Sequence, residues 1–223
     1  MDWTAPVDAY CERLHPGFWA EPLNALTNLA YLAVGVVMLA RARRAGDGGA
    51  VVLSILLCAI AVGSFLFHTV ARRWAGLADV LPIAAFIIAY VFLACRRFLG
   101  LPVAAAALAA ALVPPFSAAV AWALRAALGG LGGSEGYLGT LMLFAAFALA
   151  LARRDPPLAR MIGAGGAILA VSILARSIDG AVCAIFPPGT HFLWHLLNAA
   201  MFWVMIPLIM SRRAALAQAT VRG

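Results

Sequence analysis

Hydrophobic residues run along this chain in long stretches, separated by short segments that hold arginine, proline and glycine. Seven stretches are long enough to cross the ~30 Å hydrocarbon core of a bilayer at ~1.5 Å per helical residue. We place them at about 23–40, 50–70, 79–95, 102–124, 136–152, 160–178 and 191–210. The fourth is the least regular because it contains Pro114 and Pro115, which a span tolerates where neighbouring helices satisfy the freed backbone groups. The pattern predicts an all-α membrane protein, a single seven-transmembrane-helix bundle over residues 1–223.

The composition agrees with lipid as the solvent of this chain. Hydrophobic residues make up 65% of the 223 residues and charged residues only 11%, which exceeds what a water-soluble domain of this size needs for its core. The first 22 residues lack the basic and apolar regions of a cleavable signal peptide. We therefore expect an N-terminal segment over 1–22 that stays on the protein.

The net charge of +7 reports orientation rather than a nucleic-acid partner, because the arginines lie at helix ends and not on one face or in one tail. When the connections are assigned alternately to the two sides, eleven of the sixteen basic residues share one side: Arg41, Arg43, Arg44, Arg96, Arg97, Arg153, Arg154, Arg160, Arg212, Arg213 and Arg222. By the positive-inside rule that side is cytoplasmic. The N-terminus is then outside, and residues 211–223 form a short cytoplasmic tail.

Five polar side chains lie where a bilayer would exclude them. His68 lies at the outer end of the second predicted span, with Ser64 one turn deeper on the same face. Asp79 opens the third span, and His191 and His195, ~40° apart around the helix axis, open the seventh. An ionisable group in a membrane span usually marks a site. Because all five lie at outer helix ends, we predict that they converge on one site beneath the outer surface.

Three histidines from two helices are a ligand set for zinc that leaves a fourth position open for water, as in catalytic zinc sites. Asp79 would then move protons without binding the metal. The pattern leaves plainer interpretations open: Asp79 as a helix N-cap, Ser64 as a small packing residue, and the histidines as interfacial groups. Asn198, one turn beyond His195, is expected to support a ligand.

These residues carry a resemblance to the alkaline ceramidase family, which belongs to a wider group of seven-helix membrane hydrolases related to the adiponectin and progestin receptors. The matching motifs are "SFLFH", the aspartate of "DVLP" eleven residues later, "HFLWH" in the last span, "IDGAVC" and "AYCE". The resemblance implies a hydrolase that cleaves the amide of ceramide, or of another N-acyl membrane lipid, to a fatty acid and a long-chain amine. It also implies roles for individual residues: zinc ligands at His68, His191 and His195, an acid/base at Asp79, and a hydroxyl at Ser64 that stabilises the oxyanion.

Cys11 and Cys183 are both predicted on the outer, oxidising side, where a disulfide between them is permitted but not required. The resemblance implies that the two cysteines are paired. It also implies a calcium site in the N-terminal segment, formed by Glu12, Glu21 and, by a one-residue shift, Asp8. This match is partial, because the family's aspartate and asparagine are replaced by Ala9 and Leu14, and Arg13 follows Glu12.

Two other functions compete with a hydrolase. A membrane cytochrome would use histidine pairs for haem, although three histidines with an aspartate suit zinc better. A receptor of the adiponectin-receptor type would share the zinc site, although no cytoplasmic domain is apparent. The lysine-free, arginine- and alanine-rich composition is typical of a GC-rich bacterial gene, so we expect the inner membrane, with the site toward the periplasm. The oligomeric state is not predicted.

Overall fold

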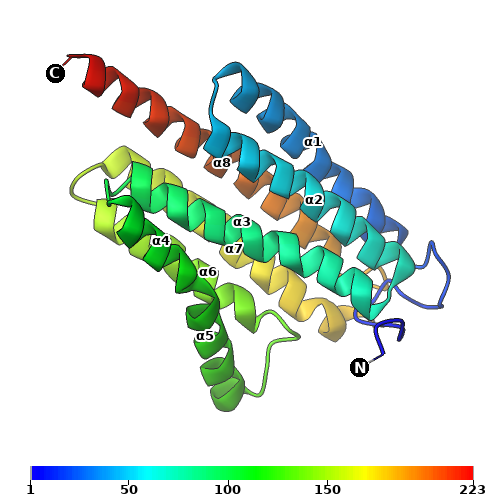
Figure 1. The fold of residues 1–223 in the computed structure, drawn as a ribbon. Coiled ribbons are helices and arrows are strands. Elements are labelled where there is room, and N and C mark those ends of the chain that lie inside the picture. The colour runs from blue at the N-terminus through cyan, green and yellow to red at the C-terminus, as the bar shows by residue number, and fades with distance from the viewer. Residues whose placement is uncertain (1, 223) are drawn as a thin grey trace.

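Eight α-helices make up the chain over residues 2–222, the part that the computed structural model describes; side chains are described for 2–127 and 129–212 (Figure 1). In chain order the helices are α1 (Pro22–Arg44), α2 (Gly48–Val70), α3 (Arg73–Arg97), α4 (Val103–Ala111), α5 (Val113–Leu128), α6 (Glu135–Leu151), α7 (Pro156–Val182) and α8 (His191–Arg222). Six stretches, with α4 and α5 joined as one, are long and apolar enough to cross a membrane, and α6 is a shorter apolar helix. The protein is therefore an all-helical, multi-pass membrane protein with six to seven apolar helices.

The predicted fourth span, 102–124, is divided in the structure. Helix α4 ends next to Leu112 and α5 leaves it at an angle (Figure 1). Pro114 and Pro115 explain the break, because neither has the N–H that would bond one turn back and both ring systems disfavour a continuous helix before them. The break turns α5 away from α3, while α5 keeps its packing against α6 (Figure 1).

Two predicted boundaries also move. Helix α3 begins at Arg73, six residues before the predicted start, because its first turns extend past the apolar run that hydropathy detects. Asp79 thus lies in the second turn, and the N-cap residue is Arg72, so the interpretation of Asp79 as a cap is wrong. The predicted tail over 211–223 is helical up to residue 222, whereas residues 1 and 223 lie outside the described part.

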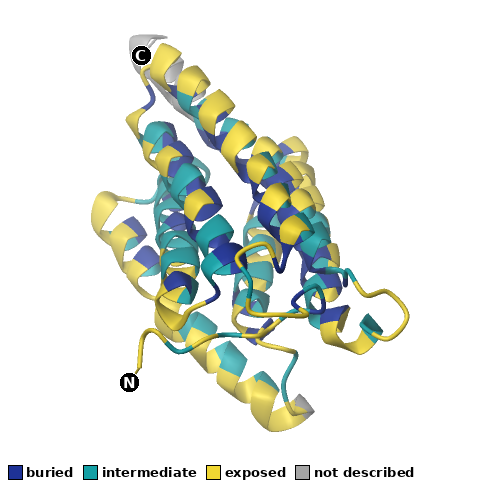
Figure 2. Cartoon of the chain, turned by 90° about the vertical axis from the view of Figure 1, so that its right-hand side faces the viewer, coloured by how far each residue is buried: buried dark blue, intermediate teal, exposed yellow. Residues whose placement is uncertain are grey.

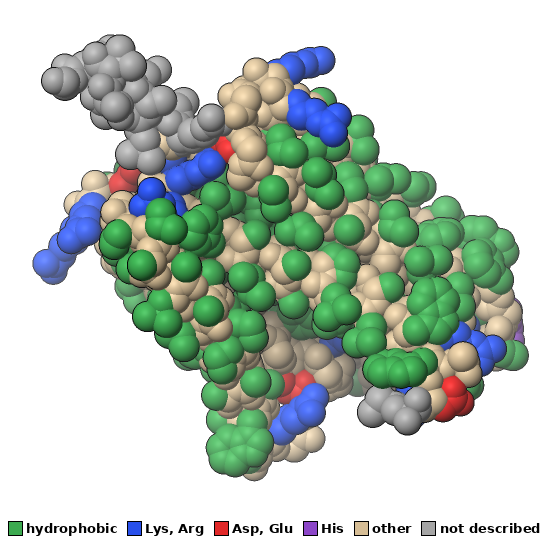
Figure 3. Space-filling view, viewed as in Figure 1, with side chains coloured by type: hydrophobic (Ala, Val, Ile, Leu, Met, Phe, Trp, Pro, Cys, Tyr) green, Lys and Arg blue, Asp and Glu red, His purple; other side chains and the backbone are tan. Residues whose placement is uncertain are grey.

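Each helix packs mainly on its sequence neighbours, and α1 packs on α8, which closes that side of the bundle. Figure 2 shows buried positions along the inward faces of the helices and exposed positions along their outward faces. The centre holds fully buried apolar side chains, among them Met38, Leu57 and Ile206. Large apolar side chains such as Leu29 and Leu81 are more than half exposed. Hydrophobic side chains are spread over much of the face shown in Figure 3. Such a surface is expected where lipid replaces water.

A glycine sets the distance between α2 and α3. A Cβ atom added at Gly63 would lie 2.0 Å from the carbonyl oxygen of Ala78 and 3.0 Å from the backbone nitrogen of Asp79. Only a residue without a side chain allows the two backbones to approach this closely. The contact places the second turn of α3, with Asp79, directly against the C-terminal half of α2.

We predict that Gly63→Ala forces α2 and α3 apart and lowers the free energy of unfolding by about 1–3 kcal/mol, as overpacking does elsewhere. Thermal unfolding of the purified protein in detergent measures the effect. Gly163→Ala is the matched control, since a Cβ at that helical glycine meets nothing within 4 Å and should be neutral or stabilising. Equal unfolding midpoints for the two variants would show that the close approach is unimportant.

Candidate active site

Three histidines meet at one end of the bundle. His68 lies near the end of α2, which stops at Val70 because Ala71 adopts a left-handed conformation with φ 48°. His191 and His195 occupy the first turns of α8. All three are at most 2% exposed, and each can offer a ring nitrogen such that the three atoms lie within 4.8 Å of one another. The prediction that they converge is confirmed.

The ring nitrogens of these histidines divide into bonded and unbonded atoms. Nδ1 of His68 lies 2.6 Å from Oε2 of Glu21, and Nδ1 of His195 lies 2.8 Å from the Thr27 hydroxyl. Nε2 of His68 and Nδ1 of His191 are buried without a hydrogen-bond partner among the described residues. Leaving a buried polar atom without a partner is costly. A histidine that binds a metal through one ring nitrogen usually donates a hydrogen bond from the other. The combination of bonded and unbonded ring nitrogens seen here fits a metal ion.

Asp79 and Ser64 face each other across the α2–α3 contact. Ser64, His68 and Arg176 are the polar or charged residues close enough to act on the Asp79 carboxylate. Asp79 is not part of the three-residue cluster that could hold a metal. The structure therefore places a carboxylate beside the histidines without making it one of the grouped ligand residues.

The N-terminal segment covers the histidines from outside the helices. The Tyr10 ring stacks on His191 with centroids 3.7 Å apart, and burial raises the pKa of the Tyr10 hydroxyl, so the stacked ring is neutral. A backbone bridge between Pro6 and Arg72 fixes the start of the segment against the α2–α3 link. The segment that we predicted as an external tail is therefore a structural part of the site.

A disulfide between Cys11 and Cys183, with Cα atoms 5.2 Å apart, joins this segment to the end of α7. Asp179 reinforces the junction, because one carboxylate oxygen accepts the Cys11 N–H and the other accepts the N–H groups of Thr190 and His191. The N–H groups of Thr190 and His191 lie at the start of α8, where backbone donors lack partners within the helix. The pairing of the two cysteines agrees with the sequence prediction, and it ties the N-terminal segment to the helix that carries two of the histidines.

Arg176 is a further cation next to the site. Its guanidinium donates to Gly132 O, the Ser134 hydroxyl and the Tyr10 hydroxyl, and it lies 5.6–5.8 Å from the ring centroids of Tyr137 and Trp194. Sequence analysis did not select it, because one arginine at a helix end is common in membrane proteins.

The three residues expected to bind calcium do not fit that ion. Asp8 is exposed. Glu12 uses both carboxylate oxygens to accept the N–H groups of Leu23 and Asn24 at the start of α1, and burial raises its pKa. Glu21 uses one oxygen for Arg13 and the other for His68. Calcium needs six to eight oxygen ligands, and these carboxylates are neither grouped nor free.

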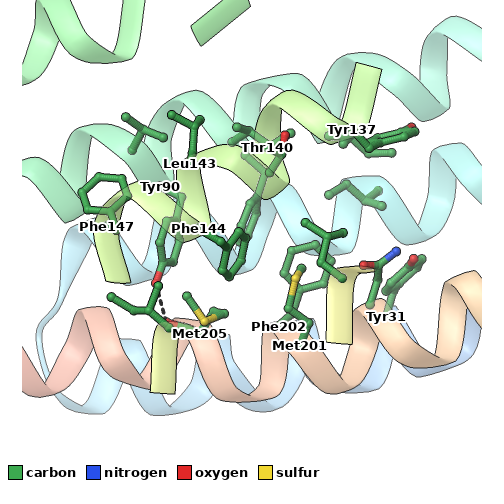
Figure 4. A pocket seen from close by; sticks show the side chains of 18 of the residues that line it. Tyr31, Tyr90, Tyr137, Thr140, Leu143, Phe144, Phe147, Met201, Phe202 and Met205 are labelled. Carbon is green, nitrogen blue, oxygen red and sulfur yellow. Dashed lines mark hydrogen bonds between the residues drawn. The ribbon is translucent and has the colours of Figure 1, made fainter. Parts of the chain in front are cut away.

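An apolar pocket lies inside the bundle next to Tyr31 and Trp194. Its lining comes from α1, α2, α3, α6, α7 and α8. Tyr31 and Tyr137 lie at one end, and Tyr90, Phe147 and Met205 lie at the other (Figure 4). The Tyr31 ring is edge-on to His195, so Tyr31 lies between the pocket that it lines and the histidine cluster.

Asn198 has a different contact from the one expected. Its side chain lines the pocket beside Tyr31, and its Oδ1 is buried without a hydrogen-bond partner among the described residues. The hydroxyl that supports His195 belongs instead to Thr27, a polar residue in the first span. The sequence places Thr27 near the same end of its span as the histidines, but it does not show which helix the Thr27 side chain contacts.

Comparison with known proteins agrees with this arrangement. A protein-family model described as Ceramidase matches residues 3–221, nearly the whole chain. A comparison with curated proteins found no match.

We predict that the disulfide contributes about 2–5 kcal/mol to the free energy of unfolding, the usual range for a native disulfide. The measurement is the thermal midpoint of wild type with and without dithiothreitol. The double variant Cys11→Ser, Cys183→Ser is the control, since it should start at the lowered midpoint and not respond to the reductant. A wild-type midpoint that ignores complete reduction would contradict the expectation.

Proposed function

The chain belongs to the Ceramidase family, and from this premise we propose that it is a zinc-dependent hydrolase that cleaves the N-acyl amide of ceramide, or of a ceramide-like lipid, within the membrane. Membership makes the protein a hydrolase of an amide bond with a lipid substrate. The zinc, the site of cleavage and the roles of individual residues are the proposed part.

One observation carries the proposal: a buried histidine cluster with unpartnered ring nitrogens lies next to Tyr31, which lines an apolar pocket inside the bundle. Histidine nitrogens are preferred ligands of zinc. His68, His191 and His195 would hold the ion, with Glu21 and Thr27 orienting two of the rings. When bound, zinc supplies a Lewis acid that polarises a carbonyl group and makes water a better nucleophile at neutral pH.

The chain's own residues provide proton transfer and positioning. Asp79 accepts a proton from the attacking water and delivers it to the amine nitrogen as the carbon–nitrogen bond breaks. Ser64 has a single hydroxyl proton, which holds the Asp79 carboxylate before the reaction. Once Asp79 is protonated it no longer requires this donor, and the hydroxyl is then available to the developing oxyanion. Asn198 lies one step away, in the pocket lining beside Tyr31, which contacts His195.

The pocket suits the hydrocarbon part of such a substrate. Its lining is almost entirely aliphatic and aromatic, which favours a lipid chain over a polar group. A chain inserted from the histidine end would leave its amide at the cluster. The products would then be a fatty acid and a long-chain amine, and both remain soluble in the bilayer.

The orientation that we propose has the histidine end of the bundle outside the cell. The N-terminal segment, the disulfide and the histidines share one end, whereas Arg41, Arg43, Arg97 and Arg212 lie at the other ends of their helices. A disulfide is expected on the oxidising side, and the arginine-rich end is expected in the cytoplasm. In a bacterial inner membrane the site would face the periplasmic leaflet, with residues 1–223 forming one seven-span domain. Family membership favours this hydrolase over the receptor and the haem protein.

We predict about one zinc ion per chain and release of fatty acid from ceramide or another N-acyl lipid. Elemental analysis of folded, purified protein and mass spectrometry of extracted lipids measure the two properties. His195→Ala should lose zinc and activity together, because it removes one of three protein ligands. A folded wild-type protein without zinc, or one that leaves every N-acyl lipid intact, would refute the proposed function.

We predict that Asp79→Asn keeps its zinc but loses at least ~10²-fold to 10⁴-fold in turnover, since asparagine cannot accept the proton. Zinc content and hydrolysis rate are measured on the same preparation. Asp2→Asn, a change at an exposed N-terminal carboxylate, is the control and should leave both unchanged. Near-normal hydrolysis by Asp79→Asn would exclude the proton-transfer role, and simultaneous loss of zinc would assign Asp79 to support of the metal.

A further inference from the structure

Arg13 is a buried cation in contact with the residue that orients His68. Its side chain is 5% exposed. Nε lies 2.5 Å from Oε1 of Glu21, and Nη2 donates to the backbone oxygen of His68 at 3.0 Å. The other oxygen of Glu21 lies 2.6 Å from Nδ1 of His68. The arginine thus holds His68 twice, directly through the main chain and indirectly through the carboxylate on the imidazole.

The charges in this group require the arginine. Glu21 is only 3% exposed, and a buried carboxylate without a counter-ion is strongly unfavourable. The guanidinium supplies that counter-ion from within the chain. The second oxygen of Glu21 faces Nδ1 of His68, and an N–H donated there leaves Nε2 as the nitrogen available to a metal. Nε2 is the His68 atom that is buried without a partner.

The same contacts occupy the two carboxylates of the N-terminal segment, Glu12 and Glu21, that match acidic ligands of calcium. Both oxygens of Glu21 are engaged, and both oxygens of Glu12 cap the first turn of α1. A divalent ion bound at Glu21 would also lie against the guanidinium, and like charges at that distance repel. The absence of a fitting calcium site and the presence of a buried arginine therefore have the same structural origin.

We propose that Arg13 is a built-in cation that does the work of a bound metal ion in the N-terminal segment: it neutralises Glu21 and thereby positions His68, so that the histidine cluster forms without calcium. Arg13 is a positioning residue, and it touches neither substrate nor zinc. This inference rests on the proposed function insofar as the cluster binds zinc.

Lysine cannot replace this arginine fully. The planar guanidinium directs separate N–H groups at a carboxylate and at a main-chain carbonyl, whereas an ammonium group is a compact point charge on a flexible stem. Arg13→Lys keeps the charge and loses the two-acceptor geometry. Arg13→Gln keeps hydrogen-bonding capacity and loses the charge.

The first experiment measures the zinc dissociation constant of the full-length protein in detergent, by competition with a chromogenic chelator. Arg13→Gln should bind zinc ~10-fold to 100-fold more weakly, the usual effect of removing an outer partner of a metal ligand, and Arg13→Lys should lie between this value and wild type. Arg72→Gln is the matched control. Arg72 also bonds the N-terminal segment, through Thr4 O, but it is exposed and has no contact with His68 among those described. Its zinc affinity should equal that of wild type.

The second experiment uses the wild type alone. Calorimetric titration of calcium-depleted protein with calcium chloride should give no binding heat, and millimolar calcium should not change the thermal midpoint. Saturable calcium binding that raises the midpoint would overturn the inference, as would wild-type zinc affinity in Arg13→Gln. If Arg13→Gln does not fold, Arg13→Lys decides, because wild-type affinity there removes the positioning role. A wild type without zinc refutes the proposed function instead, so the two failures are distinguishable.

Discussion

Burial of three imidazoles at one end of an apolar bundle is the constraint on which the site depends. Each ring has two nitrogens, and a buried nitrogen without a partner is costly. The structure bonds Nδ1 of His68 and of His195 to side chains from the N-terminal segment and from α1. The remaining nitrogens are left for a metal. The cluster therefore combines histidines of α2 and α8 with partners from the N-terminal segment and α1. This requirement explains why the N-terminal segment is held by several contacts.

Two separate sets of contacts hold the N-terminal segment, and each set acts on a different histidine. The disulfide and Asp179 attach it to the start of α8, where His191 lies under Tyr10. Arg13 and Glu21 attach it to His68 at the end of α2. Because α8 and α2 are far apart in sequence, the segment acts as a brace between two helices that share few direct contacts. Loss of the Arg13–Glu21 tie would change the geometry of the histidine cluster more than the stability of the bundle, whose apolar core does not include these residues.

Much of the fold could be predicted, because long apolar runs have few alternatives in a membrane. The histidine cluster was also predictable, since ionisable residues at one depth are rare without a function. Hydropathy did not show that α3 starts at Arg73, because the first turns of that helix lie outside the apolar run. It also did not show that α4 and α5 are separate helices, because two prolines between apolar residues leave an apolar average. The partners of the histidines were harder still. Nothing in the sequence distance between Thr27 and His195, or between Arg13 and His68, specifies a contact, and only packing decides it.

The predicted calcium site shows the same limit from the other direction. Glu12 and Glu21 match acidic calcium ligands by sequence. In the structure Glu12 accepts backbone N–H groups at the start of α1, and Glu21 contacts Arg13 and His68. A carboxylate near a helix start can cap that helix, and a buried carboxylate can be neutralised by any cation that reaches it. An arginine in the chain has an advantage over a free ion here, because its charge is present at every calcium concentration. The cost is that it occupies one fixed position, so the geometry of His68 is tied to the fold of the N-terminal segment rather than to the ionic composition of the medium.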